Sequence, residues 1–386
     1  MNEKMKTEWK KVKFGEICSF KTGKLNSNAA TQNGQYPFFT CSQETFKTDT
    51  YSFDTEAIIL GGNNANGIYP IKYFKGKFDA YQRTYVIKAL DEMQINNRFL
   101  FYNLKLRLNL LQSLSTGVAT KFLTLTILKD LEVLTPHLPI QCKIASILSA
   151  YDDLIENNTR RIKILEEMAQ AICKEWFVNF RFPGHEKVKM VDISVETHGN
   201  ASLQNKIPEG WEVKSVRDLV KRLKAGNTYT QKDVLSFGNV PVVDQSRDEI
   251  LGFHNNEPTH YASSTNPIII FGDHTCKMQI IVEPFSLGPN VIPFISNENS
   301  TIYFLFFTIR NLVETREYKR HWNELIVKKV VLPEKRLQIL FSDTVRPMTE
   351  DIGLLRKKNL NLQRTRDLLL PKLISGGIDV EGIEVW

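Results

Sequence analysis

Residues 144–176, IASILSAYDDLIENNTRRIKILEEMAQAICKEW, and residues 341–373, FSDTVRPMTEDIGLLRKKNLNLQRTRDLLLPKL, carry the pattern that decides the fold. Mostly apolar residues recur in each stretch at alternating steps of 4 and 3, and a constant offset of 197 residues relates the two stretches. A mean step of about 3.5 residues is the repeat of a coiled-coil seam, and an apolar stripe of this length needs a partner helix. The sequence therefore predicts two long helices that pair along their seams.

The seam residues follow from this spacing. The first seam comprises Ile144, Leu148, Tyr151, Ile155, Asn158, Ile162, Leu165, Ala169, Ile172 and Trp176. The second comprises Phe341, Val345, Met348, Ile352, Leu355, Asn359, Leu362, Arg366, Leu369 and Leu373. An antiparallel pairing about a pseudo-twofold axis brings Asn158 opposite Asn359, where two buried amides fix the register at a cost in stability. The pairs expected at the ends are Ile144 with Leu373 and Trp176 with Phe341. The alternative is two amphipathic helices that each pack only on their own domain.

Prolines and a polar stretch set the expected ends of these helices. Pro139 suits the first turn of the first helix, where the backbone N–H needs no intrahelical partner. Pro347 lies inside the second pattern, so we expect a kink or a broken first section there, and we expect Pro371 to end the helix. Residues 183–206 combine glycine with scattered charges, which is typical of a linker between the two halves.

The stretches that precede the two long helices lack the helical pattern, and both stretches begin with a similar sequence. Residues 9–17 resemble residues 211–219, and short runs rich in β-branched and aromatic residues alternate with Gly, Asn and Pro. Such runs predict strands of a mixed domain with long loops. The predicted fold class is α+β, with two globular mixed α/β domains separated by two long antiparallel coiled-coil helices in a pseudo-twofold internal repeat. The predicted bounds are 1–138 and 207–332 for the globules, 139–182 and 333–376 for the helices, 183–206 for the linker and 377–386 for a tail.

The composition is that of a soluble globular protein. Hydrophobic residues make up 42% of the chain and charged residues 24%. Because we recognise neither a secretory signal nor an apolar run of membrane length, we expect a cytoplasmic protein without membrane contact. The five cysteines form no CxxC pair, which argues against a disulfide framework or a zinc site. A net charge of +7 suggests an anionic partner such as nucleic acid.

The motifs of a self-sufficient enzyme are missing from the sequence. There is no Pro-Pro dipeptide for the Asn/Asp-Pro-Pro-aromatic motif of a methyltransferase. Residues 61–67 are glycine-rich but lack GxGxxG spacing and the P-loop lysine, so we interpret them as a loop between strands. His254, His260, His274 and Cys276 match no standard metal-ligand spacing. We therefore expect no catalytic, cofactor or metal site in this chain.

The duplicated plan of globule and long helix, together with five motifs, resembles the specificity subunits of type I restriction-modification systems. The motifs are residues 9–12 (WKKV), 208–211 (PEGW), 115–123 (STGVATKFL), 239–246 (NVPVVDQS) and 270–275 (IFGDHT). The first two resemble the starts of target-recognition domains, the third a Ser/Thr-Gly stretch late in such a domain, and the others elements of a second domain type. The resemblance covers essentially the whole chain. The second half departs from the first at residues 321–325 (HWNEL), where the Ser-Thr-Gly stretch would recur. The two globules are therefore expected to read different bases.

The resemblance implies a non-catalytic subunit that reads an asymmetric two-part DNA site, one half with each globule. At about 1.5 Å per residue the first seam measures about 50 Å, which exceeds one DNA turn of about 34 Å, so the helices would set the spacer. The implied partners are double-stranded DNA, two modification subunits that bind S-adenosylmethionine and methylate adenine at N6, and motor-nuclease restriction subunits. S-adenosylmethionine, ATP and Mg²⁺ would be held by those partners. The faces expected to dock them carry Arg160, Arg161, Lys163 and Glu166, or Arg356, Lys357 and Lys358.

The candidate DNA contacts are loop residues whose side chains suit base edges and phosphates. In the first globule they are Lys21, Lys24, Asn63, Asn64, Gln82, Arg83, Thr116 and Lys121. In the second they are Gln245, Ser246, Arg247, His274, Thr275 and Lys277. Asp244 and Asp273 are expected either to accept from cytosine amino groups or to cap turns.

Other classes of function stay open at this point. A stand-alone DNA-binding regulator would bind DNA specifically without partners. A helical interaction scaffold would show no salt-dependent DNA affinity. The missing motifs argue against a self-sufficient nuclease or methyltransferase.

Overall fold

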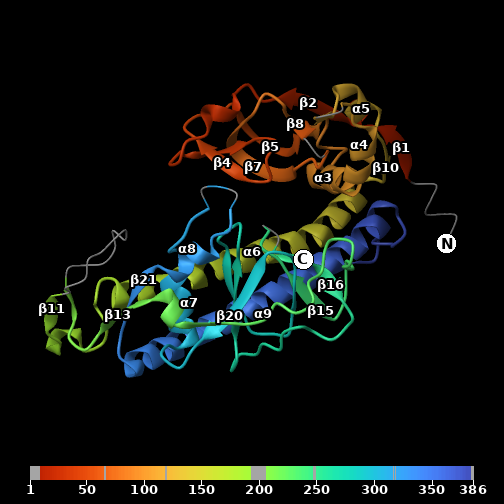
Figure 1. The fold of residues 1–386 in the computed structure, drawn as a ribbon. Helices are drawn as coiled ribbons and strands as arrows, with labels where there is room; N and C mark the ends of the chain where they lie inside the picture. Colours follow the sequence, from red (N-terminus) through yellow and green to blue (C-terminus); the bar gives the residue numbers. More distant parts are fainter. Residues whose placement is uncertain are drawn as a thin grey trace. The chain divides into compact units, whose positions relative to one another are not determined.

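The computed structural model describes residues 9–64, 67–117, 120–192, 206–246, 249–315, 317 and 319–383. Two compact units make up the chain: residues 1–156 with 359–386 form unit 1, and residues 157–358 form unit 2. Both units mix helices with strands, which confirms the predicted α+β class (Figure 1). The division falls inside the two long helices and not at residues 183–206, because each end of each helix packs into the core of a different unit.

Unit 1 is built on a six-stranded sheet with strand order β2-β8-β5-β7-β3-β4. The central strand β5 is buried over its last five residues, and its side chains alternate between two cores. Ile58 and Leu60 join the core that also holds Phe99 and Leu100 of α3, whereas Ala57 and Ile59 join Phe78 on the other face. The alternation explains why residues 57–60 form a continuous apolar run.

The elements of unit 1 have the following bounds. The strands are β1 (Lys10–Lys13), β2 (Cys18–Thr22), β3 (Tyr36–Phe39), β4 (Thr45–Thr48), β5 (Phe53–Gly61), β6 (Asn63–Asn64), β7 (Ile71–Ala80), β8 (Thr84–Ala89), β9 (Lys121–Phe122) and β10 (Glu132–Thr135). The helices of the globule are α2 (Phe14–Ile17), the 3-10 turn η1 (Ser27–Ala29), α3 (Asn97–Leu106), α4 (Leu108–Leu114) and α5 (Leu125–Asp130).

Unit 2 contains a four-stranded sheet, β14-β20-β17-β18, and a three-stranded sheet, β16-β15-β19. Its central strand β17 repeats the alternation seen in β5. Ile269 and Phe271 face the larger core with Phe294, and Ile268 and Ile270 face a smaller core. Burial of both faces accounts for the uninterrupted apolar sequence of this strand.

The elements of unit 2 have the following bounds. The strands are β11 (Met190–Asp192), β12 (Lys206–Pro208), β13 (Glu212–Ser215), β14 (Val220–Arg222), β15 (Val240–Val243), β16 (Ile250–His254), β17 (Ile268–Gly272), β18 (Met278–Ile281), β19 (Ser286–Leu287), β20 (Val291–Ser296) and β21 (Lys329–Leu332). The helical segments of the globule are η2 (His185–Lys187), η3 (Val216–Asp218), α7 (Ile302–Ile309) and α8 (Trp322–Ile326).

Part of the predicted linker is structured. β11 pairs antiparallel with β12, and Met190 lies opposite Pro208. Residues 193–205 of the predicted linker lie outside the described residues. Residues 190–192 form a strand because their extended backbone finds hydrogen-bond partners in the strand that leads into the second globule.

Each unit contains an antiparallel strand pair at the base of a long helix, and we call this pair the frame of the unit. In unit 1, β1 pairs with β10, and the N–H of Phe14 donates to the carbonyl of Leu131 at 2.9 Å. In unit 2, β13 pairs with β21, and the N–H of Val216 donates to the carbonyl of Lys328 at 2.9 Å. The sequence similarity between the two halves thus corresponds to an equivalent antiparallel strand pair in each unit.

A buried glutamine completes this frame in each unit. Gln141 accepts from the N–H of Asn96 at 2.9 Å and donates to the carbonyls of Gln94 (3.0 Å) and Pro136 (2.8 Å). Gln338 makes the corresponding set: it accepts from the N–H of Thr301 and donates to the carbonyls of Asn299 and Pro333. Since Asn96 and Thr301 are the N-cap residues of α3 and α7, each glutamine fixes a helix of the globule to a long helix.

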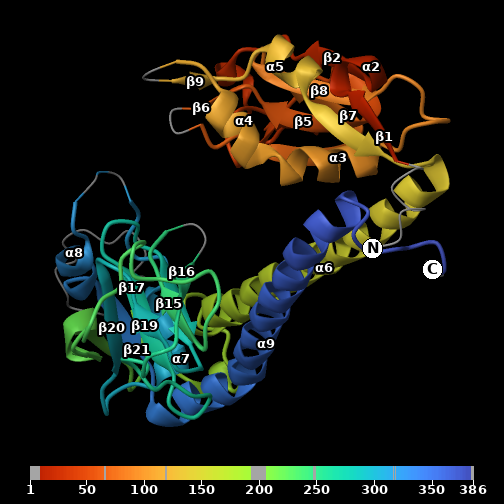
Figure 2. The ribbon, with the colours of Figure 1, turned by 90° about the vertical axis from the view of Figure 1, so that its right-hand side faces the viewer.

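Each of the two long helices, α6 (Leu138–Phe177) and α9 (Lys335–Ile374), has 40 residues (Figure 2). In unit 1, Ile144 and Leu148 of α6 share a core with Leu373 of α9. In unit 2, the ring of Trp176 lies 5.9 Å from that of Phe341. Each predicted seam residue is buried or half-buried, whereas neighbouring Leu154 is 53% exposed. The seam face is thus the covered face of each helix.

The amide of Asn359 has a partner on the facing helix of unit 1, where it donates to the carbonyl of Ile155 at 3.5 Å. Asn158 belongs to unit 2, so its pairing with Asn359 stays a prediction.

Two predictions for the prolines of α9 were wrong, the broken first section at Pro347 and the helix end at Pro371, whereas the alternative of a kink at Pro347 stays a prediction. The helix runs unbroken through Pro347 and continues past Pro371 to Ile374. A proline inside a helix removes one backbone hydrogen bond and crowds the carbonyl four residues earlier, which the remaining turns tolerate when the helix is anchored on both sides. Val345 and Leu373, which flank the two prolines, are both core residues.

Candidate nucleic-acid interface

In unit 1 the structure brings the candidate residues from distant parts of the sequence to one edge. The end of β2, with Lys21, and the segment that follows it, with Lys24, run beside the turn between β7 and β8 that carries Gln82. The N–H of Gln82 donates to the carbonyl of Leu25 at 3.0 Å, and the N–H of Gly23 donates to the carbonyl of Thr84 at 3.2 Å. These bonds hold the lysine segment against the Gln82–Arg83 turn.

The glycine-rich loop continues the same edge. The N–H of Gly62 donates to the carbonyl of Arg83 at 2.8 Å. A Cβ at Gly62 would lie only 2.6 Å from that carbonyl oxygen, so the close approach requires glycine. The loop therefore places Asn63 and Asn64 next to Arg83.

The Ser-Thr-Gly stretch, residues 115–123, forms the last part of this edge. Asn63 pairs with Phe122 and Asn64 with Lys121 in the β6–β9 ladder. Thr116 and Phe122 exchange backbone hydrogen bonds of 2.8 and 3.1 Å. All eight candidates of the first globule thus lie along one continuous edge, whose β6–β9 end is labelled in Figure 2. We call this the unit 1 edge, defined by residues 21–25, 62–64, 82–83 and 116–122, of which residues 118 and 119 lie outside the described part.

The unit 1 edge carries positive charge that its own carboxylates do not neutralise. Lys21, Lys24 and Arg83 are exposed and Lys121 is half-buried. Within the described residues, none of these four cations forms a salt bridge. Cations without carboxylate partners on an exposed edge suit phosphate oxygens.

Sequence reasoning did not single out Phe122. Its side chain is 37% exposed and lies under the guanidinium of Arg83, 5.6 Å from the ring centroid. Its position next to Lys121 in the Ser-Thr-Gly stretch was the available signal. An aromatic ring beneath a guanidinium restricts the orientation of that guanidinium.

In unit 2 the described candidates also come together. The N–H of His274 donates to the side-chain oxygen of Gln245 at 3.0 Å, and the hydroxyl of Thr275 donates to the Gln245 carbonyl at 3.0 Å. Lys277 donates to the carbonyl of Ser246 at 3.0 Å. The end of β15 and the β17–β18 turn therefore form one cluster, which we call the unit 2 cluster. Arg247 lies outside the described residues.

Three charged side chains in this region make contacts within the protein. Lys277 forms an ion pair with Glu249 at 3.2 Å. Asp244 accepts from the N–H of Ser246 at 3.2 Å, and Asp273 accepts from the N–H of Trp322 at 2.9 Å. Both carboxyl groups belong to buried residues. Of the two roles considered for these aspartates, the structure therefore fits the capping of turns.

The segment that departs from the first half lies at the unit 2 cluster. His274 makes a hydrogen bond through Nδ1 with the carbonyl of Lys319 at 3.1 Å, and the N–H of His321 donates to the carbonyl of Asp273 at 2.8 Å. Arg320 reaches Asp273 at 3.9 Å with a side chain that is 76% exposed. Residues 319–321 thus lie against the β17–β18 turn at the unit 2 cluster. The exposed cations Lys319 and Arg320 were missed because no motif marked them.

The buried histidines of unit 2 are structural. His254 contacts the Ser286 hydroxyl through Nε2 at 2.9 Å, while the N–H of Asn256 donates to Nδ1 at 3.1 Å. Because Nδ1 accepts, Nε2 carries the proton and His254 cannot act as a base toward Ser286. Burial lowers the pKa of His254 and of His260. Among the described residues no three potential ligands gather into a metal-binding group.

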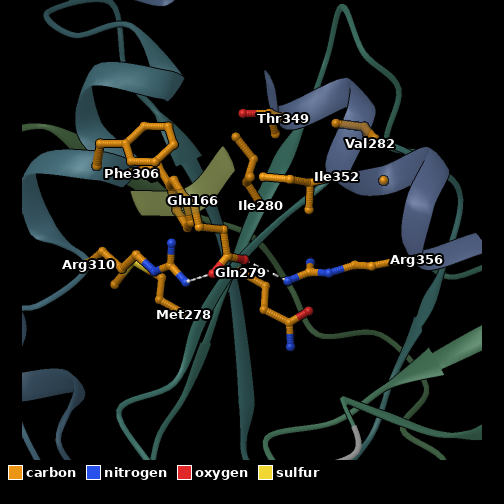
Figure 3. A pocket seen from close by; sticks show the side chains of 12 residues that line it. Glu166, Met278, Gln279, Ile280, Val282, Phe306, Arg310, Thr349, Ile352 and Arg356 are labelled. Carbon is orange, nitrogen blue, oxygen red and sulfur yellow. Dashed lines mark hydrogen bonds and ion pairs between the residues drawn. The ribbon is translucent and has the colours of Figure 1, made fainter. Parts of the chain in front are cut away.

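The expectation that Glu166 and Arg356 lie on free docking faces was wrong. Glu166 of α6 accepts from Arg310 and from Arg356 of α9, each at 3.0 Å, beside a small cavity (Figure 3). A carboxylate at the helix contact is stabilised by two cations and is not available to a partner. Arg160, Arg161, Lys163, Lys357 and Lys358 are exposed. No described helix has the length and apolar character needed to span a bilayer.

Comparisons with known proteins identify relatives of this chain. Residues 6–167 match the family model of the type I restriction modification DNA specificity domain. The chain is 31% identical over 242 residues to the type I restriction enzyme EcoDI specificity subunit of Escherichia coli, and the match covers 58% of this chain and 52% of that protein. It is 28% identical over 315 residues to the MjaIX specificity subunit of Methanocaldococcus jannaschii, covering 74% and 70%.

A solved structure shows a similar fold along most of the chain. The crystal structure of the type I restriction-modification system S subunit from M. genitalium has a TM-score of 0.58 at 18% identity, covering 95% of this chain and 96% of that one. Residues 6–167 therefore match the type I restriction modification DNA specificity domain, and the chain is similar to type I restriction enzyme specificity subunits.

Proposed function

We propose that this chain is the non-catalytic DNA-reading subunit of a type I restriction-modification complex. It reads an asymmetric two-part site, one half with the unit 1 edge and the other with the unit 2 cluster. The observation that carries the proposal is the unit 1 edge, where eight candidate residues from separate segments converge and four cations have no carboxylate partner among the described residues.

The chemistry of the unit 1 edge suits both parts of DNA recognition. Lys21 and Lys24 supply charge for phosphates, which position a protein on the duplex without reading sequence. Asn64 and the exposed Gln82 supply amide groups that can donate to and accept from one base at once, whereas the amide oxygen of Asn63 is buried. Arg83 suits the two acceptors of guanine.

The unit 2 cluster supports a second half-site of different sequence. Its polar groups are Gln245, Ser246, His274 and Thr275, flanked by Lys319 and Arg320. It lacks the paired asparagines of the unit 1 edge within the part of the chain that is described. Two different sets of donors and acceptors favour two different base sequences.

The long helices have a further role in the proposal. They would pair as an antiparallel coiled coil about a pseudo-twofold axis and set the unread spacer, since 40 residues measure about 60 Å at about 1.5 Å each. Their exposed residues Arg160, Arg161, Lys163, Lys357 and Lys358 would contact two modification subunits and the restriction subunits. Those partners would hold S-adenosylmethionine, ATP and Mg²⁺ and would methylate adenine at N6 or cut the DNA.

Methylome sequencing tests the proposal. Cells that contain this chain and its cognate methyltransferase are compared with cells in which only this chain is deleted. The expected result is N6-methyladenine at one asymmetric two-part motif, which disappears with the deletion. An unchanged methylome, with the methyltransferase shown to be active, would contradict the proposal and favour a stand-alone regulator.

A further inference from the structure

Ionic side chains of alternating sign run through unit 2 from the long helices toward the unit 2 cluster. The first three are Arg310, which follows α7, Glu166 of α6 and Arg356 of α9. Both cations bind Glu166 at 3.0 Å, through different carboxylate oxygens. Figure 3 shows this carboxylate between the two guanidinium groups. Glu166 therefore joins the two long helices to the end of α7.

The same series continues to the end of β15. Arg356 lies 3.6 Å from Glu249, and Glu249 lies 3.2 Å from Lys277. Lys277 in turn donates to the carbonyl of Ser246 at 3.0 Å. Arg310, Glu166, Arg356, Glu249 and Lys277 thus form a row of five alternating charges, which we call the ion-pair chain.

The ion-pair chain lies in partly buried surroundings. Its five side chains are between 24% and 32% exposed, in contrast to surface pairs of this protein such as Lys214 with Glu212, whose side chains are 41% and 62% exposed. Reduced solvent contact strengthens each pair relative to a surface salt bridge. Each carboxylate also has a cation on both sides, so neutralising one carboxylate leaves two cations without their shared partner.

The backbone conformation at Glu249 is a second observation that points to a role for its carboxylate. Its φ is +63°, in the left-handed region where glycine is the favoured residue. Its carbonyl accepts from the N–H of Asp244 at 2.8 Å, which fixes this conformation beside the end of β15. Because backbone preference alone would favour glycine, the glutamate at this position is explained by its carboxylate.

We propose that Glu249 is a positioning residue for recognition of the second half-site. Held by Arg356 and Lys277, its carboxylate keeps the end of β15 in register with the long helices. Gln245 and Ser246 are then presented to DNA in one geometry. The inference rests on the proposed function, because it assigns to Glu249 a part in reading one half of the site.

Four variants test this role in the complex with the cognate methyltransferase. Glu249→Gln keeps the shape of the side chain and removes its charge. Glu249→Gly removes the charge and relieves the backbone, and Arg356→Gln breaks the link to α9. Glu212→Gln, which removes the exposed pair with Lys214, is the matched control. Each variant is expressed in the host, and the methylated motif is read by methylome sequencing.

The expected result is a motif that stays sharp in one half and becomes degenerate in the other. For both Glu249 variants we expect about a fivefold or larger rise in methylation at sites with a single mismatch in that half, whereas Glu212→Gln leaves the motif unchanged. Arg356→Gln is expected to affect the same half. Thermal unfolding of each purified variant shows whether its fold is retained. Should Glu249→Gln not fold, Glu249→Asp, which keeps the charge on a shorter side chain, is expected to relax the same half partially.

Three outcomes would overturn the inference while the proposed function stands. The first is a methylated motif that stays specific in both halves when Glu249→Gln is expressed. The second is an equal loss of methylation at all sites, which indicates a merely structural role. The third is a motif that stays specific with Glu249→Gly, which assigns the effect to the backbone. If the unmodified chain directs no motif at all, the proposed function itself fails and the inference fails with it.

Discussion

Substitution of Gln141 by leucine is expected to destabilise unit 1 by an amount that follows from its contacts. The side chain is 1% exposed and makes three hydrogen bonds, to the N–H of Asn96 and to the carbonyls of Gln94 and Pro136. Leucine has a similar volume but satisfies none of them. At about 1 kcal/mol for each lost bond, the free energy of unfolding should fall by about 3 kcal/mol.

The assay is thermal unfolding of the purified chain, followed by calorimetry. For a unit of this size, about 3 kcal/mol corresponds to a fall in Tm of about 6–12 °C in the transition that belongs to unit 1. Gln32→Leu, at an exposed position of the same unit, serves as the control and should shift Tm by less than about 2 °C.

A second substitution separates hydrogen bonding from packing. Gln141→Glu keeps the acceptor for Asn96 but turns a carboxylate oxygen toward the carbonyls of Gln94 and Pro136, so it should destabilise unit 1 at neutral pH and less so in acid. The equivalent Gln338→Leu should lower the transition of unit 2 by a similar amount, since Gln338 makes the same set of bonds. If Gln141→Leu behaves like Gln32→Leu, the frame does not fix the globule to the helix.

Three further predictions concern charge, pH and register. Replacing Lys21 and Lys24 together by alanine should reduce the slope of log K against log salt by about 2 on a non-specific duplex, because each phosphate contact contributes about one unit; an unchanged slope would remove these lysines from the interface. Because burial lowers the folded-state pKa of His254 below the ordinary 6.5, the unfolded state binds the proton first. Stability is therefore fully present above about pH 6.5 and declines as the pH falls toward the lowered value, and urea titrations at pH 7.5 and 5.5 should show this decline reduced in His254→Gln. Replacing Asn158 and Asn359 together by leucine should raise Tm if they form a buried polar pair, whereas a lower Tm would count against that pair.

The sequence by itself determined the elements that depend on local periodicity and on duplication. The alternating 4 and 3 steps predicted the long helices, and the covered face of each helix holds the residues named from that spacing. The buried strands β5 and β17 were recognisable as short apolar runs, because burial on both sides leaves no polar position in the pattern. Gln141 and Gln338 are separated by the same offset of 197 residues as the seams, and they make equivalent hydrogen bonds.

Tertiary structure alone decided which distant residues meet. Nothing in the local sequence around Glu166 distinguishes a carboxylate between two arginines from one on an open helix face, because its partners lie 144 and 190 residues away. The break at Pro347 and the helix end at Pro371 were wrongly predicted for a related reason, since core packing on either side outweighs a local helix-breaking preference. The unit 1 edge likewise exists only after the chain brings Lys21, Arg83 and Lys121 together, and chain contacts of that range leave no periodic signal in the sequence.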